Sequence, residues 1–294
     1  MIKCNLCNNK EYEIIYDNAI RNGITGTKTK IRHKVVKCSS CGLVRLLENP
    51  LNIEYYQSDE YRSSYNNTTK ANEYIQMHDN EQPPRLAKIG VNSFRNKIVL
   101  DYGCGGGAFL DLIKGLADKT IGIEPYAGYH KSLKNRCHIV FPSSKKAKLE
   151  YKNKIDTIVS FGVLEHVEDP SEYLKDAFSM LKKGGKMYIE TDNLDDILMK
   201  LGVSSFDKFF YRTAHLWYFD AITLKKITEK AGFSNIKTSF RHNFDLSNTI
   251  VWLRDNKPTG NGKINLFNKE INNNWINFLE EEGLADLVCA EISK

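Results

Sequence analysis

Short apolar runs alternate with helix-like segments between residues 96 and 254 of the chain. This alternation is typical of a parallel sheet with helices packed against it, and it predicts an α/β domain. The helices expected after the strands include Ala108–Leu116 and Ile222–Ala231. The expected strands are Lys97–Tyr102, Thr120–Glu124, Cys137–Phe141, Ile155–Phe161, Lys186–Glu190, Phe233–Phe240 and Thr249–Leu253.

One further helix carries clear start and stop signals. Asp169 suits the N-cap, Pro170 suits the first helical position, and Glu172 completes a capping-box pattern. Gly184 follows the apolar face of this segment and is expected to end the helix.

The hydrophobic pattern divides the chain into four consecutive segments. Residues 1–45 hold paired cysteines and two β-like runs, which predicts a small metal-binding module. Residues 46–95 are polar and rich in Tyr and Asn, and we expect a linker or substrate-side helical segment. Residues 96–254 form the α/β domain. Residues 255–294 begin with a turn-forming stretch and are expected to form a helical tail packed against the body.

Composition limits the classes of protein that fit this pattern. The chain has 294 residues, is 41% hydrophobic, and has no apolar run long enough to span a membrane. The first residues lack the apolar stretch of a signal peptide, so we expect a cytoplasmic protein. The net charge of +6 is mild and spread along the chain, which favours a small-molecule partner over nucleic acid. The oligomeric state is left open by the sequence.

Four of the seven cysteines form two close pairs. Cys4 and Cys7 make the first pair, and Cys38 and Cys41 make the second. Four such thiolates complete the tetrahedral shell that Zn²⁺ prefers, and a closed shell indicates a structural role. Gly42 directly after the second pair suits the tight turn of a zinc knuckle. The pattern therefore predicts a structural zinc ion, with iron as the alternative metal.

The strongest sign of catalytic chemistry is a glycine loop after the first expected strand. Gly103, Gly105 and Gly107 follow Asp101 in the pattern Asp-x-Gly-x-Gly-x-Gly. Glycine allows a sharp turn from strand to helix and a close approach of the backbone to a ligand. Glu124 stands at the end of the next strand, where a carboxylate can accept two hydrogen bonds from a ribose diol.

Residues of about 80–254 resemble the class I methyltransferases that depend on S-adenosylmethionine (SAM), which have a Rossmann-like fold. The resemblance rests on the glycine loop, on the segment Asp156–Val167 and on the turn Leu181–Gly185. It implies that Asp101 and the loop hold the methionine part of SAM, and that Glu124 holds the ribose. The implied cofactor residues are Asp101, Gly103, Gly105, Gly107, Glu124, Pro125, Phe161, Gly162 and Leu164.

The chain departs from this family after the third strand. Many members have an acid followed by a small residue near the adenine of SAM. Here the region reads Phe141-Pro142-Ser143-Ser144, without an acid.

Features outside the SAM motifs resemble methyltransferases that modify deoxysugars and surface glycans. A cysteine module precedes the SAM domain in those enzymes, and Tyr55–Tyr61 resembles their substrate-side segment. Tyr211–Phe219 resembles their Glu-His-x-x-Tyr-Phe signature, with Ala214 in place of the acid. The resemblance suggests Tyr61, Trp217 and Tyr218 as residues that stack on a substrate, with ordinary packing as the alternative.

Methyl transfer from SAM rests largely on positioning, but a hydroxyl acceptor benefits from a general base. His215 is the first candidate and His166 the second, because imidazole titrates near neutral pH. Since Ala214 removes the carboxylate expected beside His215, a weaker base is predicted. A weaker base favours methylation of oxygen or nitrogen over carbon.

The sequence therefore predicts methyl transfer to a small molecule such as a nucleotide sugar or glycan precursor. Two alternatives stay open. One is an rRNA or tRNA base methyltransferase with a zinc module, supported by the basic stretch Lys28–Lys37. The other is a non-catalytic partner protein that retains SAM binding.

Overall fold

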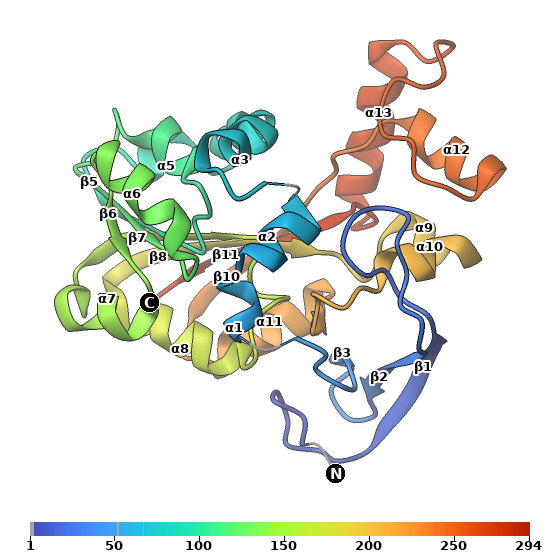
Figure 1. Cartoon of the computed structure of the whole chain (residues 1–294), viewed down its shortest axis with the longest axis horizontal. Coiled ribbons are helices and arrows are strands. Elements are labelled where there is room, and N and C mark those ends of the chain that lie inside the picture. Colours follow the sequence, from blue (N-terminus) through green and yellow to red (C-terminus); the bar gives the residue numbers. More distant parts are fainter. Residues whose placement is uncertain (1–2, 52, 67) are drawn as a thin grey trace. The chain divides into compact units, whose positions relative to one another are not determined.

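The computed structural model describes residues 3–51, 53–66 and 68–294 (Figure 1). The chain divides into two compact units. Each unit combines stretches that are far apart in the sequence, so the units differ from the four consecutive segments of the sequence analysis. The first unit comprises Met1–Pro50, Glu190–Lys226 and Thr238–Ala290. The second unit comprises Leu51–Ile189, Ile227–Lys237 and Glu291–Lys294.

The second unit contains most of a seven-stranded sheet with the order β10-β11-β8-β7-β4-β5-β6, whose strands β8, β10 and β11 also include residues of the first unit. β4 pairs in parallel with β5 and β7, and β5 pairs in parallel with β6. This confirms the expected α/β class with a Rossmann-like sheet. The strands are β4 (Ile98–Tyr102), β5 (Lys119–Ile123), β6 (Ile139–Phe141), β7 (Ile155–Phe161), β8 (Leu181–Asp192), β10 (Ser234–Arg241) and β11 (Leu287–Ser293).

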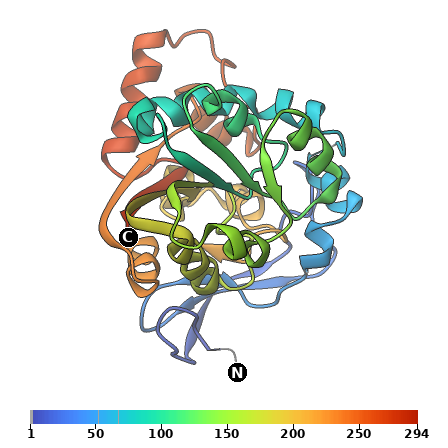
Figure 2. The same cartoon turned by 90° about the vertical axis from the view of Figure 1, so that its left-hand side faces the viewer.

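Helices link these strands and lie on both sides of them (Figure 2). The inner strands are buried because their side chains are almost all apolar, as Val99, Leu100 and Ile158 show with no exposed area. The linking helices are α5 (Ala108–Ile113), α6 (His130–Asn135), α7 (Ser144–Tyr151) and α8 (Pro170–Met180).

The start of α8 is confirmed, but its predicted end is wrong. The Asp169 carboxylate accepts hydrogen bonds from the backbone N–H groups of Ser171 and Glu172, at 2.8 and 3.1 Å. The helix ends at Met180, and Gly184 lies inside β8 instead. Its N–H donates to the carbonyl of Lys294 at 3.0 Å. The glycine therefore marks an irregular strand, not the end of a helix.

Four short helices precede the sheet of the second unit. They are α1 (Ile53–Tyr56), α2 (Asp59–Asn66), α3 (Ala71–His78) and α4 (Gln82–Ile89). Ala71 of α3 is buried in a cluster with Cys104, Tyr129 and Leu133. The start of this helix therefore packs beside the loop that follows β4.

The first unit contains a four-stranded sheet with the order β1-β2-β3-β9. These strands are β1 (Tyr12–Asn18), β2 (His33–Cys38), β3 (Val44–Leu46) and β9 (Trp217–Tyr218). The sheet packs with α9 (Ile197–Lys200) and α10 (Ser204–Phe210) around one apolar core. That core includes Ile20, Val35, Val44, Leu46, Phe206, Phe210, Tyr211 and Tyr218.

The C-terminal part differs from the prediction in two places. Thr249–Leu253, expected as a strand, lies inside α12 (Leu246–Asp255). The Asp245 side chain caps that helix, and β-branched residues within it gave the strand-like pattern. The expected helical tail contains α13 (Lys269–Glu281) but ends in β11. The remaining helix, α11 (Ala221–Lys230), has the predicted position.

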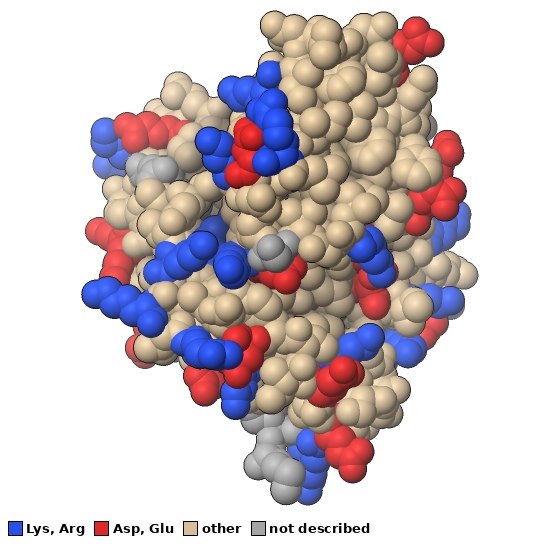
Figure 3. All heavy atoms as spheres, turned by 90° about the vertical axis from the view of Figure 1, so that its right-hand side faces the viewer, with Lys and Arg blue, Asp and Glu red and all other residues tan. Residues whose placement is uncertain are grey.

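The surface carries charges of both signs. On the face shown in Figure 3, blue and red side chains are interspersed and do not gather into one basic stripe. Among the described residues, no helix combines the length and the apolar character needed to cross a membrane.

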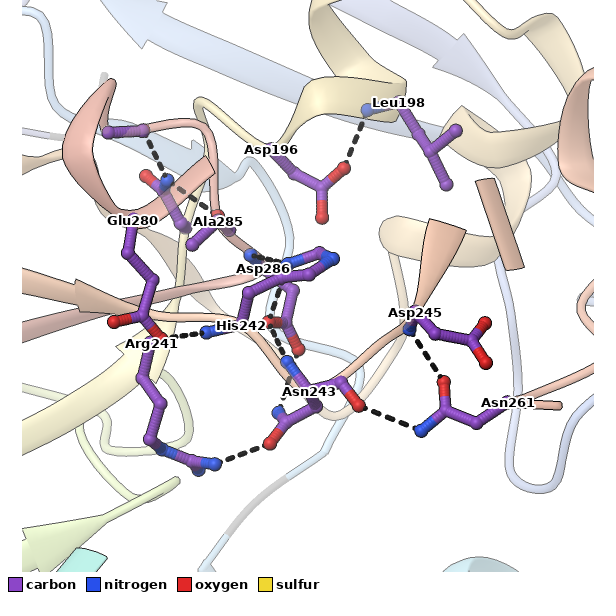
Figure 4. Close-up of polar contacts among 12 residues, drawn as sticks. Asp196, Leu198, Arg241, His242, Asn243, Asp245, Asn261, Glu280, Ala285 and Asp286 are labelled. Carbon is purple, nitrogen blue, oxygen red and sulfur yellow. Dashed lines mark hydrogen bonds and ion pairs between the residues drawn. The ribbon is translucent and has the colours of Figure 1, made fainter. Parts of the chain in front are cut away.

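A polar cluster in the first unit joins β10 to the segments around α13 (Figure 4). Arg241 makes a two-pronged contact with the Glu190 carboxylate, at 2.7 and 2.8 Å. The backbone N–H of His242 donates to Glu280 at 2.9 Å, and that of Asp286 donates to His242 Nδ1 at 3.0 Å. These bonds attach the C-terminal segment to its own unit.

Candidate functional site

The predicted cofactor residues meet at the carboxyl ends of three adjacent strands of the second unit. The glycine loop follows β4, Glu124 follows β5, and Gly162 follows β7. Ligands of open α/β sheets bind at this edge, because the strand-to-helix loops gather there.

The glycine loop needs its glycines. Gly103, Gly105 and Gly107 have φ values of 97°, 52° and 90°, a region that other residues rarely adopt. A Cβ on Gly103 would lie 2.5 Å from the Val163 side chain, and one on Gly105 would lie 2.6 Å from Tyr74. The loop is therefore held tightly between the segment after β7 and helix α3.

Glu124 is buried at the end of β5 and accepts three hydrogen bonds. Its Oε1 accepts from the Arg62 guanidinium at 2.6 Å and from the N–H of Tyr126 at 2.8 Å. Its Oε2 accepts from the N–H of Gly105 at 2.9 Å. The carboxylate predicted to hold the ribose thus links β5 to the glycine loop and to α2.

Asp101 is buried in β4, 4% exposed. Burial raises the pKa of its carboxyl to about 7, although Arg85 opposes the shift and Glu124 adds to it. A carboxylate in such surroundings gains most from a cationic partner, and the α-ammonium of a bound methionine group has that charge. The binding of that ammonium by Asp101 stays a prediction of the family resemblance.

The remaining cofactor candidates surround the loop after β7. The Phe161 ring lies 5.0 Å from that of Phe109, and the Arg85 guanidinium lies 4.7 Å above it. Gly162 has φ 65°, and Leu164 is fully buried. Pro125 directly follows Glu124. In the segment after β6, where the family resemblance implies the adenine of SAM, Ser144 donates to Asp176 of α8 at 2.6 Å, an acid that the sequence pattern did not indicate.

His166 and Tyr61 belong to one aromatic cluster of the second unit. The ring of Tyr56 lies 5.8 Å from His166 and 4.9 Å from Tyr61, both in edge-on contact. Both side chains are half-buried. His166 and Tyr61 therefore lie close together because both contact the ring of Tyr56.

His215 lies in a turn of the first unit, directly before β9, and is 4% exposed. Its Nδ1 lies 3.2 Å from Oδ2 of Asp192, the last residue of β8. The same oxygen accepts from Arg212 at 2.6 Å. Burial would raise the pKa of Asp192, but Arg212 and His215 lower it well below its ordinary value.

Asp192 corrects one sequence-based expectation. Ala214 predicts that His215 has no carboxylate beside it, yet the structure supplies one from Asp192, 23 positions earlier in the sequence. The sequence analysis missed Asp192 because it lies within an ordinary strand-end stretch. The only signal for Asp192 in the sequence is that it is an acidic residue close to the end of an expected strand.

Trp217 and Tyr218 occupy β9 and are each 1% exposed. The Arg45 guanidinium lies 4.7 Å above the Trp217 ring. The Tyr218 hydroxyl accepts from the N–H of Arg212 at 3.0 Å, and its ring packs in the core of the first unit. These contacts favour the packing interpretation for both residues.

The four paired cysteines meet in the first unit. Cys4 Sγ lies 3.5 Å from Cys41 Sγ, Cys7 Sγ lies 3.5 Å from Cys38 Sγ, and all four sulfurs lie within 4.8 Å of one another. Four thiolates about 2.3 Å from a tetrahedral zinc ion are spaced by about 3.8 Å. The donor set and its spacing therefore fit a zinc ion.

The two cysteine turns share one backbone design. The residue after each second cysteine, Asn8 or Gly42, has positive φ, at 64° and 85°. Its N–H donates to the carbonyl of the first cysteine of its pair, at 2.8 Å for Asn8 and 3.0 Å for Gly42. The sequence indicated this turn at Gly42 and missed the matching one at Asn8.

Comparison with known proteins identifies the family. Residues 75–238 match the family model described as a methyltransferase domain, which covers more than half of the chain. A SAM-dependent methyltransferase structure from Archaeoglobus fulgidus has a TM-score of 0.52 at 21% identity, covering 75% of this chain and 94% of that one. This likeness shows the fold.

Two curated relatives match shorter stretches. The mitochondrial ubiquinone biosynthesis O-methyltransferase of Homo sapiens is 28% identical over 153 residues, covering 46% of this chain and 41% of the human protein. The tRNA U34 carboxymethyltransferase of Sulfurovum sp. (strain NBC37-1) is 33% identical over 108 residues, covering 34% of this chain and 36% of that protein. The chain thus spans less than half the length of these two relatives. With the family match and the shared fold, it belongs to the methyltransferase domain family, whose enzymes transfer a methyl group from SAM.

Proposed function

We propose that the protein is a SAM-dependent methyltransferase that acts on a hydroxyl oxygen of a small molecule. The observation that carries the proposal is the meeting of three positive-φ glycines with two buried carboxylates at adjacent strand ends. In this proposal, Asp101 binds the methionine ammonium, Glu124 binds the ribose, and the loop backbone approaches the cofactor. Phe161, Gly162 and Leu164 line the remaining cofactor surface.

SAM supplies an activated methyl group, which leaves sulfur as a new bond forms at the acceptor atom. The acceptor proton must go to a base, and His215 is the proposed base because a carboxylate faces its Nδ1. His166 is the second candidate, since it lies in the second unit near Tyr56 and Tyr61.

The choice of oxygen rests on a different argument from that of the sequence analysis. The sequence-based argument against carbon methylation assumed that no carboxylate lies beside His215, whereas Asp192 supplies one. Oxygen is favoured by the activity in the name of the human relative, a ubiquinone biosynthesis O-methyltransferase, with nitrogen as the next choice. A sugar-linked acceptor is a narrower proposal, which rests on the cysteine module and on Tyr61 alone.

A second candidate function is the modification of tRNA. It is favoured by the relatives named as tRNA U34 carboxymethyltransferases. The interspersed charges on the face in Figure 3 give it no support, since nucleic-acid binders gather basic side chains.

The test uses SAM with a tritiated methyl group. Wild-type protein is incubated with either a small-molecule cell extract or total tRNA, and the label is followed into each fraction. We expect label in the small-molecule fraction. Label in tRNA would select the second candidate. Bound SAM without transfer to either fraction would point to the non-catalytic alternative.

We also propose that Cys4, Cys7, Cys38 and Cys41 hold one structural zinc ion. The ion would stabilise a module whose own apolar core is small. Metal analysis of protein purified without chelator should find about one zinc per chain. Cys38→Ser should lower the metal content, whereas the matched change Cys289→Ser, outside the cluster, should not. Metal-free wild-type protein would contradict the proposal.

A further inference from the structure

The proposed base has a partner that the sequence pattern did not indicate. Asp192 ends β8 and faces the His215 ring from a separate segment of the chain. The backbone around His215 is fixed: its N–H donates to Arg212 at 3.1 Å, and Thr213 N–H donates to Arg21 at 3.0 Å. A buried ring on a fixed backbone takes its orientation from what faces its nitrogens.

The contact favours a proton on one of the two ring nitrogens. An ionised carboxylate only accepts hydrogen bonds, so it stabilises a proton on Nδ1, which lies 3.2 Å from it although the pair is not aligned as a hydrogen bond. Nε2 then keeps its lone pair and can accept a proton from an acceptor group. The neighbouring Arg212 pairs with the same carboxylate oxygen, so the surroundings of the ring gain little net negative charge. The carboxylate therefore acts on the tautomer and the orientation of the ring more than on its basicity.

We infer that Asp192 is the positioning residue of His215 and holds the ring proton on Nδ1, so that Nε2 is the basic nitrogen. This inference rests on the proposed function in one respect only, the role of His215 as the base. The protonation of Nδ1 can be measured without SAM or acceptor.

The test is ¹⁵N NMR of the histidine side chains, assigned to His215 with the variant His215→Gln. In wild-type protein above pH 8, we expect the Nδ1–H tautomer. Asp192→Asn should shift the spectrum toward the Nε2–H tautomer. The matched variant Asp195→Asn, which removes the neighbouring acid paired with Lys200, should leave it unchanged.

The Nε2–H tautomer in wild-type protein would overturn the inference, as would an unchanged spectrum in Asp192→Asn. If Asp192→Asn does not fold because Arg212 is left unpaired, the double variant with Arg212→Met removes that charge and repeats the test. A protein that shows the tautomer but transfers no methyl group would overturn the proposed function alone.

A different observation, at Glu124 in the second unit, carries a second inference. The Arg62 guanidinium lies 5.0 to 5.7 Å from the ring centroids of four tyrosines, within reach of cation–π attraction. These rings are Tyr61, Tyr74, Tyr126 and Tyr129. Both partners of the Arg62–Glu124 ion pair are buried, with side chains 9% and 3% exposed.

The ion pair competes with the role proposed for Glu124. A carboxylate has about four acceptor positions, and three are used by Arg62, Tyr126 and Gly105. A ribose diol needs two. The two backbone donors belong to the loop and strand end themselves, so the Arg62 side chain is the donor that can leave. Its own Nε–H is buried and has no acceptor in the described part of the chain.

We propose that Arg62 is a gate for the cofactor, which holds Glu124 until the ribose of SAM replaces it. This proposal rests on the proposed SAM site. Because SAM must displace the guanidinium, its apparent affinity equals the intrinsic affinity multiplied by the fraction of protein in which the gate is open.

Stopped-flow and calorimetric binding of SAM to Arg62→Gln test the gate. We expect faster association and several-fold higher affinity than in wild-type protein, with no change in Lys70→Gln, an exposed control nearby. Weaker or unchanged binding in folded Arg62→Gln would overturn the gate. Arg62→Met, which keeps an apolar chain among the tyrosines, repeats the test if Arg62→Gln unfolds. If wild-type protein and both variants fail to bind SAM, it is the proposed cofactor site that fails.

Discussion

Asp101 and Asp192 are both buried aspartates at the ends of sheet strands, but their surroundings move their pKa values in opposite directions. Asp101 of β4 has its pKa raised to about 7, because burial outweighs the attraction of Arg85. Asp192 of β8 has its pKa lowered, because Arg212 and His215 outweigh burial. The Asp192 carboxylate has the Arg212 guanidinium at 2.6 Å and His215 Nδ1 at 3.2 Å, whereas Asp101 pairs with no cation at such a distance among the described residues.

The two aspartates differ in where their cationic partner comes from. Asp192 pairs with a side chain of the protein, whereas Asp101 is proposed to pair with a bound ligand. Around Asp192 the protein supplies Arg212 as a cationic partner, so the carboxylate is ionised and can orient His215. Around Asp101 burial raises the pKa of the carboxyl to about 7, so a cationic ligand gains most there. The same residue type thus suits positioning at one strand end and cofactor binding at the other.

The largest expected effect concerns the group that Asp192 positions. His215→Ala should lower methyl transfer on the order of 10²-fold or more, as for loss of a general base. SAM affinity should be unchanged. The paired variant His166→Ala should lose much less. The reverse order of the two losses would assign the base to His166, and wild-type turnover in both would mean that neither is the base.

Exchanging each aspartate for asparagine should change stability with opposite signs. Asp192→Asn leaves Arg212 without its anionic partner and should cost about 2 kcal/mol, as for a lost bond to a charged group. Asp101→Asn should stabilise the SAM-free protein at pH 8. Folding raises the pKa of Asp101 from 3.8 to about 7. The cost of burying its ionised form therefore does not reduce the stability of the folded protein below about pH 3.8, and it reduces that stability fully above about pH 7. Thermal melting at pH 6 and pH 8 checks both signs; equal shifts would contradict the comparison.

A smaller effect is expected on cofactor binding. Asp101→Asn should weaken SAM binding about tenfold, which corresponds to loss of roughly one charge-assisted hydrogen bond. In wild-type protein, SAM affinity should rise as the pH increases through about 7, because only the ionised carboxylate pairs with the ammonium. The variant should lack this rise. Calorimetry between pH 6 and pH 8.5 measures it, and parallel curves would remove Asp101 from the site.

The sequence predicts those features of the molecule that depend on local patterns. The strand-to-glycine-loop turn at Gly103 and the capped start of α8 at Asp169 each follow from residues close in sequence, and both are confirmed. The spacing of the paired cysteines likewise predicts the cluster that the four residues form.

Features that depend on contacts between distant segments were missed. Asp192 contacts His215, which lies 23 positions later in the sequence, and Arg62 contacts Glu124, which lies 62 positions later. Neither pair has a fixed spacing that a pattern could reveal. The strand predicted at Thr249–Leu253 failed because β-branched residues suit a buried helix when a cap such as Asp245 starts it.

The most direct test of the account is calorimetric titration of SAM into wild-type protein and Gly105→Val at pH 8. A Cβ at Gly105 would lie 2.6 Å from the Tyr74 side chain, and valine would have to adopt a φ of 52°, which is strained for any residue other than glycine. Gly115→Val is the matched control, because a Cβ there meets nothing within 4 Å. The account predicts one SAM per wild-type and Gly115→Val chain, and no measurable binding to folded Gly105→Val. Equal SAM affinity in wild-type and Gly105→Val protein, or no binding to either, would contradict it.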